Sequence, residues 1–161
     1  MSVTQQEKVI NVLFTGLGGQ GIIRASDMLA KAAFRMGYDV KKSELHGMSQ
    51  RGGSVSADVR FGKKVWSPMI PAGEADFIVA TAEDQIEVWS SMPSKNCVII
   101  RPGLFSEEEQ NSKMFNTVLL GRLNCYLKFP FELWEQLIRE SFGGAVAEAN
   151  VAAFKRGEKM E

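Results

Sequence analysis

The fold of this chain is decided by one stretch near its start, Val9-Ile10-Asn11-Val12-Leu13-Phe14-Thr15-Gly16-Leu17-Gly18-Gly19-Gln20-Gly21. Its first six residues are mostly β-branched or apolar, which is typical of a buried strand. The glycines that follow indicate a tight turn. Beyond the turn, apolar residues return at helical spacing and stop before Gly37, a natural helix end. The stretch therefore predicts a strand, a glycine turn and a helix, as in a Rossmann-like fold.

The segments that follow predict an α/β fold with a mixed sheet. Residues 39–45 and 54–61 have the pattern of strands, and the second alternates apolar with polar side chains, as a strand with one solvated face does. The turn 62–64 then indicates a hairpin into a strand at Val65-Trp66, so this part of the sheet is expected to be antiparallel. Further strands are expected at 75–82 and 96–100, with a helix at 84–92.

The last third of the sequence predicts a C-terminal helical segment. Apolar residues between 115 and 126 share one helical face, and Pro130 stands in the first turn of the next expected helix. Gly143-Gly144 interrupts the pattern. A final amphipathic helix is expected from Ala145 to Arg156, with its end at Gly157.

Composition limits the classes of function. The 161 residues fall in the range of one domain, and 19 basic residues balance 19 acidic ones, so no charge excess points to nucleic acid or a membrane surface. No apolar run approaches the roughly 20 residues of a membrane span, which favours a cytoplasmic protein. Cys97 and Cys125 are too few for a zinc or iron–sulfur site. A redox centre is therefore expected on another chain or in an organic cofactor.

The glycine turn is the first candidate site. Gly16, Gly18 and Gly21 satisfy G-x-G-x-x-G, and the extra Gly19 is expected to leave three backbone N–H groups open at a helix N-terminus, where an anion can bind. The phosphate-binding candidates are Gly18, Gly19, Gln20 and Gly21. The alternative is a tight turn that binds nothing. A dinucleotide would also need an acid about 20 residues later, for which Glu44 is the candidate, but no acid–base set for hydride transfer follows.

The second candidate site is the polar loop 46–53. Ser49, Gln50 and Arg51 offer a hydroxyl, an amide and a guanidinium, which can bind a carboxylate, a phosphate or neighbouring backbone. The alternatives are that Arg51 pairs with a surface carboxylate and that His46 is structural. We expect the two loops to lie together at one rim of the sheet, facing a shared cleft.

A third segment, Trp66-Ser67-Pro68-Met69-Ile70-Pro71, is apolar and contains two prolines. It either caps the core or forms a subunit contact, since tryptophan and methionine are enriched in interfaces. An exposed aromatic patch here predicts that the isolated chain self-associates into a homo-oligomer when its partner is missing.

Several motifs resemble one known family. They are Gly16 to Gly21, Ser43 to Val55 with the string His46-Gly47-Met48-Ser49-Gln50-Arg51-Gly52-Gly53, Val59 to Gly62, and Ser67-Pro68. They resemble the gamma-type domain of pyruvate and 2-oxoacid:ferredoxin oxidoreductases, with the beta subunit of indolepyruvate:ferredoxin oxidoreductase the nearest likeness. The string from 46 to 53 is much more specific than the glycine turn, and the likeness extends over nearly the whole chain.

The resemblance implies a three-layer α/β/α domain spanning residues 1–161. It also implies a larger partner subunit that carries thiamine diphosphate and 4Fe-4S clusters, decarboxylates an aryl 2-oxoacid, passes electrons to ferredoxin and forms an acyl-CoA. This chain would supply no catalytic residue and would be inactive alone. Gly18 to Gly21 would cradle a phosphate of coenzyme A, and residues 49–51 would line the pocket or the interface.

Two alternatives to this function remain open from the residues. One is a stand-alone Rossmann-type dehydrogenase that binds NAD or NADP. The other is a coenzyme A- or nucleotide-binding module without an oxidoreductase partner. One departure from the family also stands out, since members carry an extra strand and helix between residues 100 and 116, where only Arg101 to Lys113 intervenes here.

Overall fold

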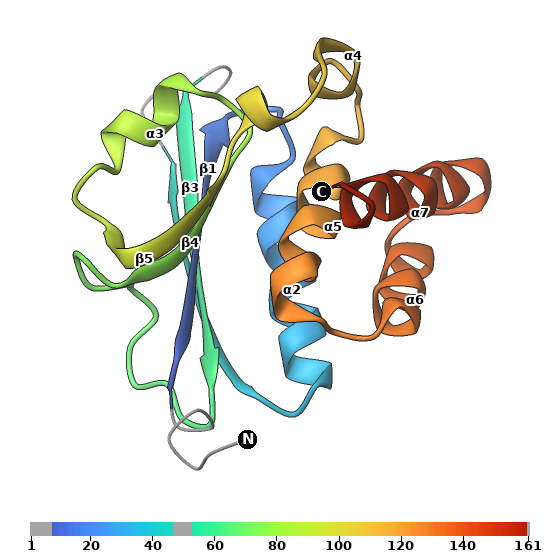
Figure 1. Cartoon of the computed structure of the whole chain (residues 1–161). Coiled ribbons are helices and arrows are strands. Elements are labelled where there is room, and N and C mark those ends of the chain that lie inside the picture. The colour runs from blue at the N-terminus through green and yellow to red at the C-terminus, as the bar shows by residue number, and fades with distance from the viewer. Residues whose placement is uncertain (1–7, 47–52, 161) are drawn as a thin grey trace.

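A five-stranded sheet in the order β2-β3-β1-β4-β5 forms the centre of the molecule (Figure 1). The computed structural model describes residues 8–46 and 53–160. The strands are β1 Ile10–Leu17, β2 Asp39–His46, β3 Ser54–Gly62, β4 Ala75–Ala80 and β5 Pro93–Ile100. The helices are α2 Ile22–Arg35, α3 Asp84–Val88, α4 Glu107–Gln110, α5 Phe115–Leu127, α6 Phe131–Ser141 and α7 Gly144–Glu158, with a 3₁₀ turn η1 at Pro102–Leu104.

The sheet is mixed, as the sequence predicts. β1 runs antiparallel to β3 and parallel to β4, while β2 pairs antiparallel with β3 and β5 pairs parallel with β4. The antiparallel hairpin is formed by β2 and β3. The predicted strand at Val65-Trp66 is wrong, because these residues are not in a strand. The N–H of Val65 donates to Asp39 Oδ2 at 2.8 Å, so a side chain takes the donor that a strand ladder would use.

Most helices cover one face of the sheet. α2 and α5 lie against it and α6 and α7 lie outside them, whereas the opposite face carries α3 and the irregular segment 63–74 (Figure 1). Alternation along β1 explains the division, since Phe14 joins the core under the helices and Leu13 joins a smaller cluster on the other side. The expected third layer is therefore present but thin.

Two glycines bring α5 and α7 into backbone contact. A Cβ on Gly121 would lie 2.1 Å from the carbonyl oxygen of Phe154, and one on Gly157 would lie 2.0 Å from that of Val118. The predicted helix end at Gly157 is wrong, since α7 continues to Glu158. Gly157 is required by the close approach of the two helices and not by a helix stop.

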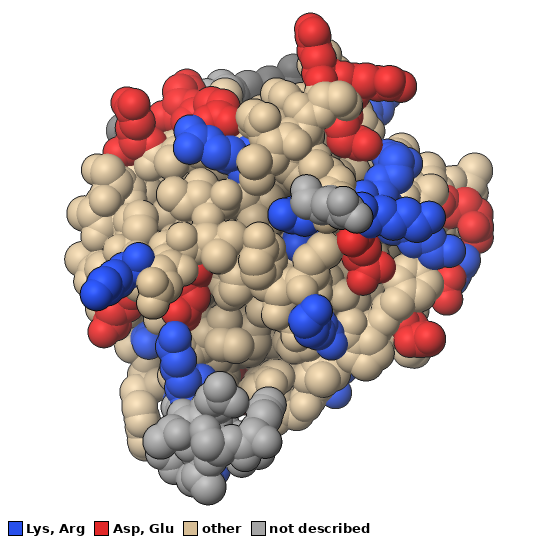
Figure 2. All heavy atoms as spheres, in the orientation of Figure 1, with Lys and Arg blue, Asp and Glu red and all other residues tan. Residues whose placement is uncertain are grey.

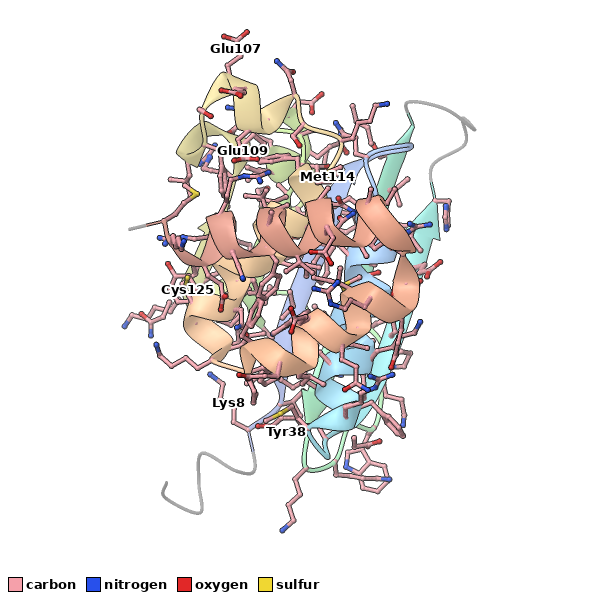
Figure 3. All side chains as sticks on the ribbon, turned by 90° about the vertical axis from the view of Figure 1, so that its right-hand side faces the viewer. Lys8, Tyr38, Glu107, Glu109, Met114 and Cys125 are labelled. Atoms are coloured by element: carbon pink, nitrogen blue, oxygen red, sulfur yellow. The ribbon has the colours of Figure 1, made fainter. Side chains whose placement is uncertain are left out.

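The connection from β5 to α5 is short. It contains only η1 and α4, and among the described strands β5 has a neighbour on one side only. The acidic side chains of α4 stand out at the top of the molecule (Figure 2). Glu109 of α4 pairs with Arg156 of α7 at 3.0 Å, which ties the connection to the C-terminal helix (Figure 3).

Candidate anion-binding cleft

The glycine turn leads from the end of β1 into α2, at the carboxyl end of the parallel strands. Gly19 and Gly21 have φ values of 90° and 75°, in the left-handed region that favours glycine. Gly16 is required for a different reason, because a Cβ there would lie 2.0 Å from Thr81 Oγ1. The sequence pattern thus reflects both backbone conformation and close packing.

Gln20 fixes the shape of the turn. Its Oε1 accepts a hydrogen bond from the N–H of Leu17 at 2.8 Å and one from the hydroxyl of Thr81 at 2.6 Å. Thr81 follows β4, so Gln20 ties the ends of two adjacent parallel strands together. The described geometry therefore gives Gln20 a supporting role in the turn.

The N–H groups of the turn divide into engaged and open ones. Gly18 N–H donates to the carbonyl of Gly53 at 2.8 Å, and Gln20 N–H donates to that of Leu17 at 3.2 Å. The N–H groups of Gly19, Gly21 and Ile22 have no acceptor among the described residues. The open donors thus include the start of α2, where the helix dipole adds positive potential.

A cleft of about 1030 Å³ opens beside these donors. Its walls come from the glycine turn, the first turn of α2, Thr81 after β4, the connection before α5, and the α6–α7 corner. The residues that line it are Leu17, Gly18, Gly19, Gln20, Gly21, Ile22, Ile23, Arg24, His46, Val55, Thr81, Gln110, Ser112, Lys113, Met114, Phe115, Asn116, Phe142, Val146 and Asn150.

The cleft is positively charged although the chain has no net charge. Among the described residues that line it are the cationic Arg24 and Lys113 together with His46, and none of these described residues is an aspartate or a glutamate. The Arg24 guanidinium lies 4.9 Å from the centre of the Phe142 ring, which holds that charge at the rim. An anionic ligand is therefore favoured over a cationic one.

Part of the cleft wall is apolar. Ile23, Met114, Phe115, Phe142 and Val146 contribute hydrocarbon surface next to the basic groups. Met114 lies at the start of α5, below α4 (Figure 3). The cleft therefore matches a ligand that combines phosphate groups with a less polar remainder.

The second loop begins and ends beside the glycine turn. Ser49, Gln50 and Arg51 lie outside the described residues, so the structure places only the ends of the loop. His46 lines the cleft, and the carbonyl of Gly53 accepts the hydrogen bond from Gly18. The expected meeting of the two loops at one rim of the sheet holds for these ends.

Glu44 does not take the position that a dinucleotide requires. β2, which carries it, is separated from β1 by β3 (Figure 1). The Glu44 carboxylate instead pairs with Lys42 and lies 3.4 Å from His46 Nε2. The hydrogen bond from Lys42 is the main cause that lowers the pKa of Glu44, and His46 adds to it. The geometry therefore disfavours a ribose contact by this residue.

Thr81, Lys113 and Asn116 were not predicted from the sequence to be site residues. Asn116 Nδ2 donates to the carbonyl of Gly21 at 3.1 Å, and a Cβ on Gly21 would lie 2.4 Å from the same nitrogen. The general rule that sites form beyond the carboxyl ends of parallel strands could have pointed to Thr81. Lys113 and Asn116 carry no local signal.

Comparison with known proteins gives consistent matches. Residues 11–104 match the family model described as pyruvate ferredoxin/flavodoxin oxidoreductase. The indolepyruvate oxidoreductase subunit IorB of Pyrococcus horikoshii is 52% identical over 193 aligned positions, which cover 94% of this chain and 96% of that protein. Because the alignment is longer than the 161 residues of this chain, the relative has segments without a counterpart here.

Two solved structures share the fold. The gamma subunit of a keto/oxoacid ferredoxin oxidoreductase from Geobacter sulfurreducens has a TM-score of 0.77 at 19% identity, covering 95% of this chain and 96% of that one. A 2-oxoglutarate:ferredoxin oxidoreductase from Magnetococcus marinus, with 2-oxoglutarate, coenzyme A and succinyl-CoA bound, also has a TM-score of 0.77 at 19% identity. It covers 96% of this chain, which corresponds to 31% of that longer chain.

The described residues contain neither a candidate membrane span nor a candidate metal site. No helix in residues 8–46 and 53–160 is both long and apolar enough to cross a membrane. Within the same residues, no group of three or more histidine, cysteine or acidic side chains could hold a metal ion.

Proposed function

The chain belongs to the pyruvate ferredoxin/flavodoxin oxidoreductase family, and from this premise we propose that it is the smaller subunit of an indolepyruvate:ferredoxin oxidoreductase. The complex would oxidatively decarboxylate an aryl 2-oxoacid, transfer the acyl group to coenzyme A and pass two electrons to ferredoxin. The relative from Pyrococcus horikoshii, aligned over nearly its full length, supports this choice of substrate.

Thiamine diphosphate and the 4Fe-4S clusters belong, in this proposal, to the larger partner subunit. A 4Fe-4S cluster needs four thiolate ligands, and the whole sequence has two cysteines. Cys97 lies on β5 and Cys125 on α5, and burial raises the pKa of the Cys97 thiol, which disfavours the thiolate. These residues do not fit a cluster, so the chain would be inactive alone.

Coenzyme A is the ligand that we propose for the cleft. Its phosphates would accept hydrogen bonds from the N–H groups of Gly19, Gly21 and Ile22, with Lys113 and Arg24 supplying charge. The apolar wall would contact the less polar parts of the molecule. The contribution of this chain to the reaction would then be to bind and orient the thiol substrate for the acyl group on the partner. Ser49, Gln50 and Arg51 remain our proposal for further pocket or interface residues.

One observation carries the assignment of the cleft. Arg24, Lys113 and His46 line it, no carboxylate lines it in the part of the chain that the structure describes, and open main-chain donors lie at its edge. A cleft of about 1030 Å³ has room for a large part of a coenzyme A molecule. The Magnetococcus marinus enzyme, which has the same fold over part of its length, was solved with coenzyme A bound.

The assignment is tested by calorimetric titration of coenzyme A into wild type, Gly19→Ala and Gly37→Ala. Gly19 and Gly37 have φ values of 90° and 93°, and a Cβ on either would meet nothing within 4 Å. The two variants therefore carry similar backbone strain of about 1 kcal/mol, but only Gly19→Ala puts a methyl group beside the open donors. We expect Gly19→Ala to weaken binding at least about tenfold and Gly37→Ala to leave it within about twofold.

Equal affinities for the three proteins would refute the cleft as the coenzyme A site. The subunit role is tested separately by affinity purification from the source cell. A larger protein with bound thiamine diphosphate and iron–sulfur absorbance should co-purify. A chain that oxidises 2-oxoacids alone would contradict the role, and micromolar NADH binding would restore the dehydrogenase alternative.

Four further proposals accompany this function. We place the complex in the cytoplasm, and we treat residues 1–161 as one domain. Ferredoxin would interact through the complex, and we propose no nucleic acid partner. The balance of 19 basic and 19 acidic residues supports the last point.

A further inference from the structure

A rigid, exposed apolar segment lies at the other end of β1 from the cleft. It connects β3 to β4 over the sheet face opposite the helices. Val65 and Ile70 are 1% and 5% exposed and anchor it to the core, whereas Trp66 and Met69 between them are 86% and 65% exposed. We call residues 65–70 the Trp66 segment.

Arg60 of β3 holds the middle of the Trp66 segment. Its Nη1 donates to the carbonyl of Ser67 at 2.8 Å and to that of Met69 at 3.2 Å. Its Nε donates to Asn11 Oδ1 at 2.8 Å, which fixes the guanidinium on the sheet. One side chain therefore holds two backbone carbonyls of the exposed turn.

Two carboxylates hold the ends of the segment. Asp39 Oδ2 accepts from the N–H of Val65 at 2.8 Å, and Asp58 Oδ2 accepts from the N–H of Ile70 at 2.9 Å. Pro68 restricts the backbone between them. Trp66 is thus held in solvent by a fixed scaffold, and its exposure does not result from a loose loop. A preorganised aromatic residue loses little conformational entropy on binding, which is characteristic of interface hot spots.

Charge around the segment selects the chemistry of its partner. Residues 59–73 contain Arg60, Lys63 and Lys64, and the acidic residues Asp58 and Glu74 flank this stretch. Lys64 Nζ lies 4.9 Å from the centre of the Trp66 ring. The carboxylates of Asp39 and Asp58 accept hydrogen bonds at the two anchored ends of the segment, whereas Lys63 and Lys64 are exposed next to Trp66. A complementary surface would therefore offer an apolar pocket with carboxylates at its rim.

We infer that the Trp66 segment is the docking surface for the larger subunit, with Trp66 inserted into such a pocket. The inference rests on the proposed function. A second copy of this chain is a poorer partner, because a symmetric contact would place Lys63 and Lys64 of both copies near one another. Ferredoxin is also a poorer partner, since it must approach the clusters expected on the larger subunit. Docking here does not cover the glycine turn, so it is compatible with a larger subunit that also extends to the cleft end of β1, where its acyl group would meet the thiol.

The test measures the affinity of the larger subunit for immobilised wild type, Trp66→Ala and Phe34→Ala. Phe34 on α2 is 71% exposed, so Phe34→Ala removes a comparable exposed ring at another surface. We expect Trp66→Ala to weaken binding at least about 30-fold and Phe34→Ala to leave it within about twofold. Lys63→Glu and Lys64→Glu together should slow association and reduce its dependence on salt.

The outcomes separate the docking inference from the function. Loss of binding in Trp66→Ala, with unchanged unfolding and coenzyme A titration curves, supports the inference. Equal binding by wild type and Trp66→Ala overturns the inference and leaves the subunit role intact. Failure of wild type to bind any thiamine- and cluster-containing subunit overturns both. A wild-type homodimer that Trp66→Ala dissociates, with binding of the larger subunit unchanged, would reassign the surface to self-association.

Discussion

The two ends of β1 present opposite kinds of surface. At its carboxyl end, Leu17 leads into a turn whose open groups are main-chain donors. At its amino end, Asn11 supports Arg60, which holds a segment whose exposed groups are large side chains. The first region depends on the absence of side chains and the second on their presence. Adding a side chain should therefore damage the first region, and removing a side chain should damage the second.

The largest effect is expected at the cleft end, from Gly16→Ala. The added Cβ would lie 2.0 Å from Thr81 Oγ1 and 2.8 Å from Ile22 Cγ1, so the hydrogen bond between Thr81 and Gln20 must break. We expect the free energy of unfolding to fall by about 3 kcal/mol and coenzyme A binding to be lost. Urea denaturation and calorimetry measure both.

A matched control for this variant is Gly143→Ala. A Cβ on Gly143 would meet nothing within 4 Å and its φ is −98°, so the change should cost almost nothing. A stable Gly16→Ala protein that still binds coenzyme A would show that the turn tolerates side chains. The contrast between the two ends of β1 would then fail.

The next largest effect is expected from Arg60→Met at the opposite end. The variant keeps most of the apolar stem and removes the hydrogen bonds to Ser67, Met69 and Asn11. We expect a loss of about 2 kcal/mol in unfolding free energy and faster amide hydrogen exchange in the Trp66 segment. Binding of the larger subunit should weaken although Trp66 is unchanged. Unaltered exchange at Ile70 would show that the scaffold does not depend on Arg60.

A smaller effect is expected from Lys113→Glu at the cleft. Lys113 is exposed at the rim, and the described residues that line the cleft include no carboxylate. Charge reversal should weaken coenzyme A binding about tenfold at low salt and less at high salt. The control is Lys95→Glu on β5, which has the same charge change away from the cleft. Equal effects of the two variants would mean that Lys113 acts only through net charge.

The smallest effect concerns the pH dependence of the Trp66 segment. Burial raises the pKa of Asp58 above its ordinary value, against the lowering effects of the Ile70 N–H and Arg60. The folded chain therefore binds this proton more tightly than the unfolded chain, and ionisation of Asp58 costs stability as the pH rises through the folded pKa. Asn in its place keeps an acceptor for Ile70 and cannot ionise.

Wild type should thus be most stable relative to Asp58→Asn at low pH, and this advantage should decline as the pH rises. Urea denaturation of both proteins at about pH 4 and about pH 7 measures the change. A constant difference between the proteins over this range would contradict the raised pKa. A difference that grows with pH would mean that Asp58 is stabilised as a carboxylate.

Local patterns in the sequence were sufficient for the strand, turn and helix at 9–36. In that stretch, the spacing of apolar residues and the positions of the glycines determine the structure through residues that are close together in the sequence. The same reasoning misplaced the hairpin at Val65, because the competing acceptor is Asp39, which lies 26 residues away. It also misread Gly157, because the need for a glycine comes from contact with α5.

The part of the candidate site that lies within one segment of the sequence, the glycine turn, was predictable, and the parts contributed by distant segments were not. The glycine turn was identified, but its open donors are the N–H groups of Gly19, Gly21 and Ile22, because those of Gly18 and Gln20 donate to the carbonyls of Gly53 and Leu17. Asn116 lies 95 residues from Gly21, and only the packing of α5 brings it to the turn. The basic lining of the cleft likewise comes from three separate elements. No local pattern encodes such an assembly.

Among the strands that the structure describes, β5 pairs only with β4, so its other side is open to a further strand. Its outward main-chain groups can accept another strand without displacing β1 or β4. The same openness carries a hazard during synthesis, since an uncovered strand can pair with a strand of another molecule. Pro93 and Lys95, in the first half of β5, are the two residues best suited to oppose such aggregation.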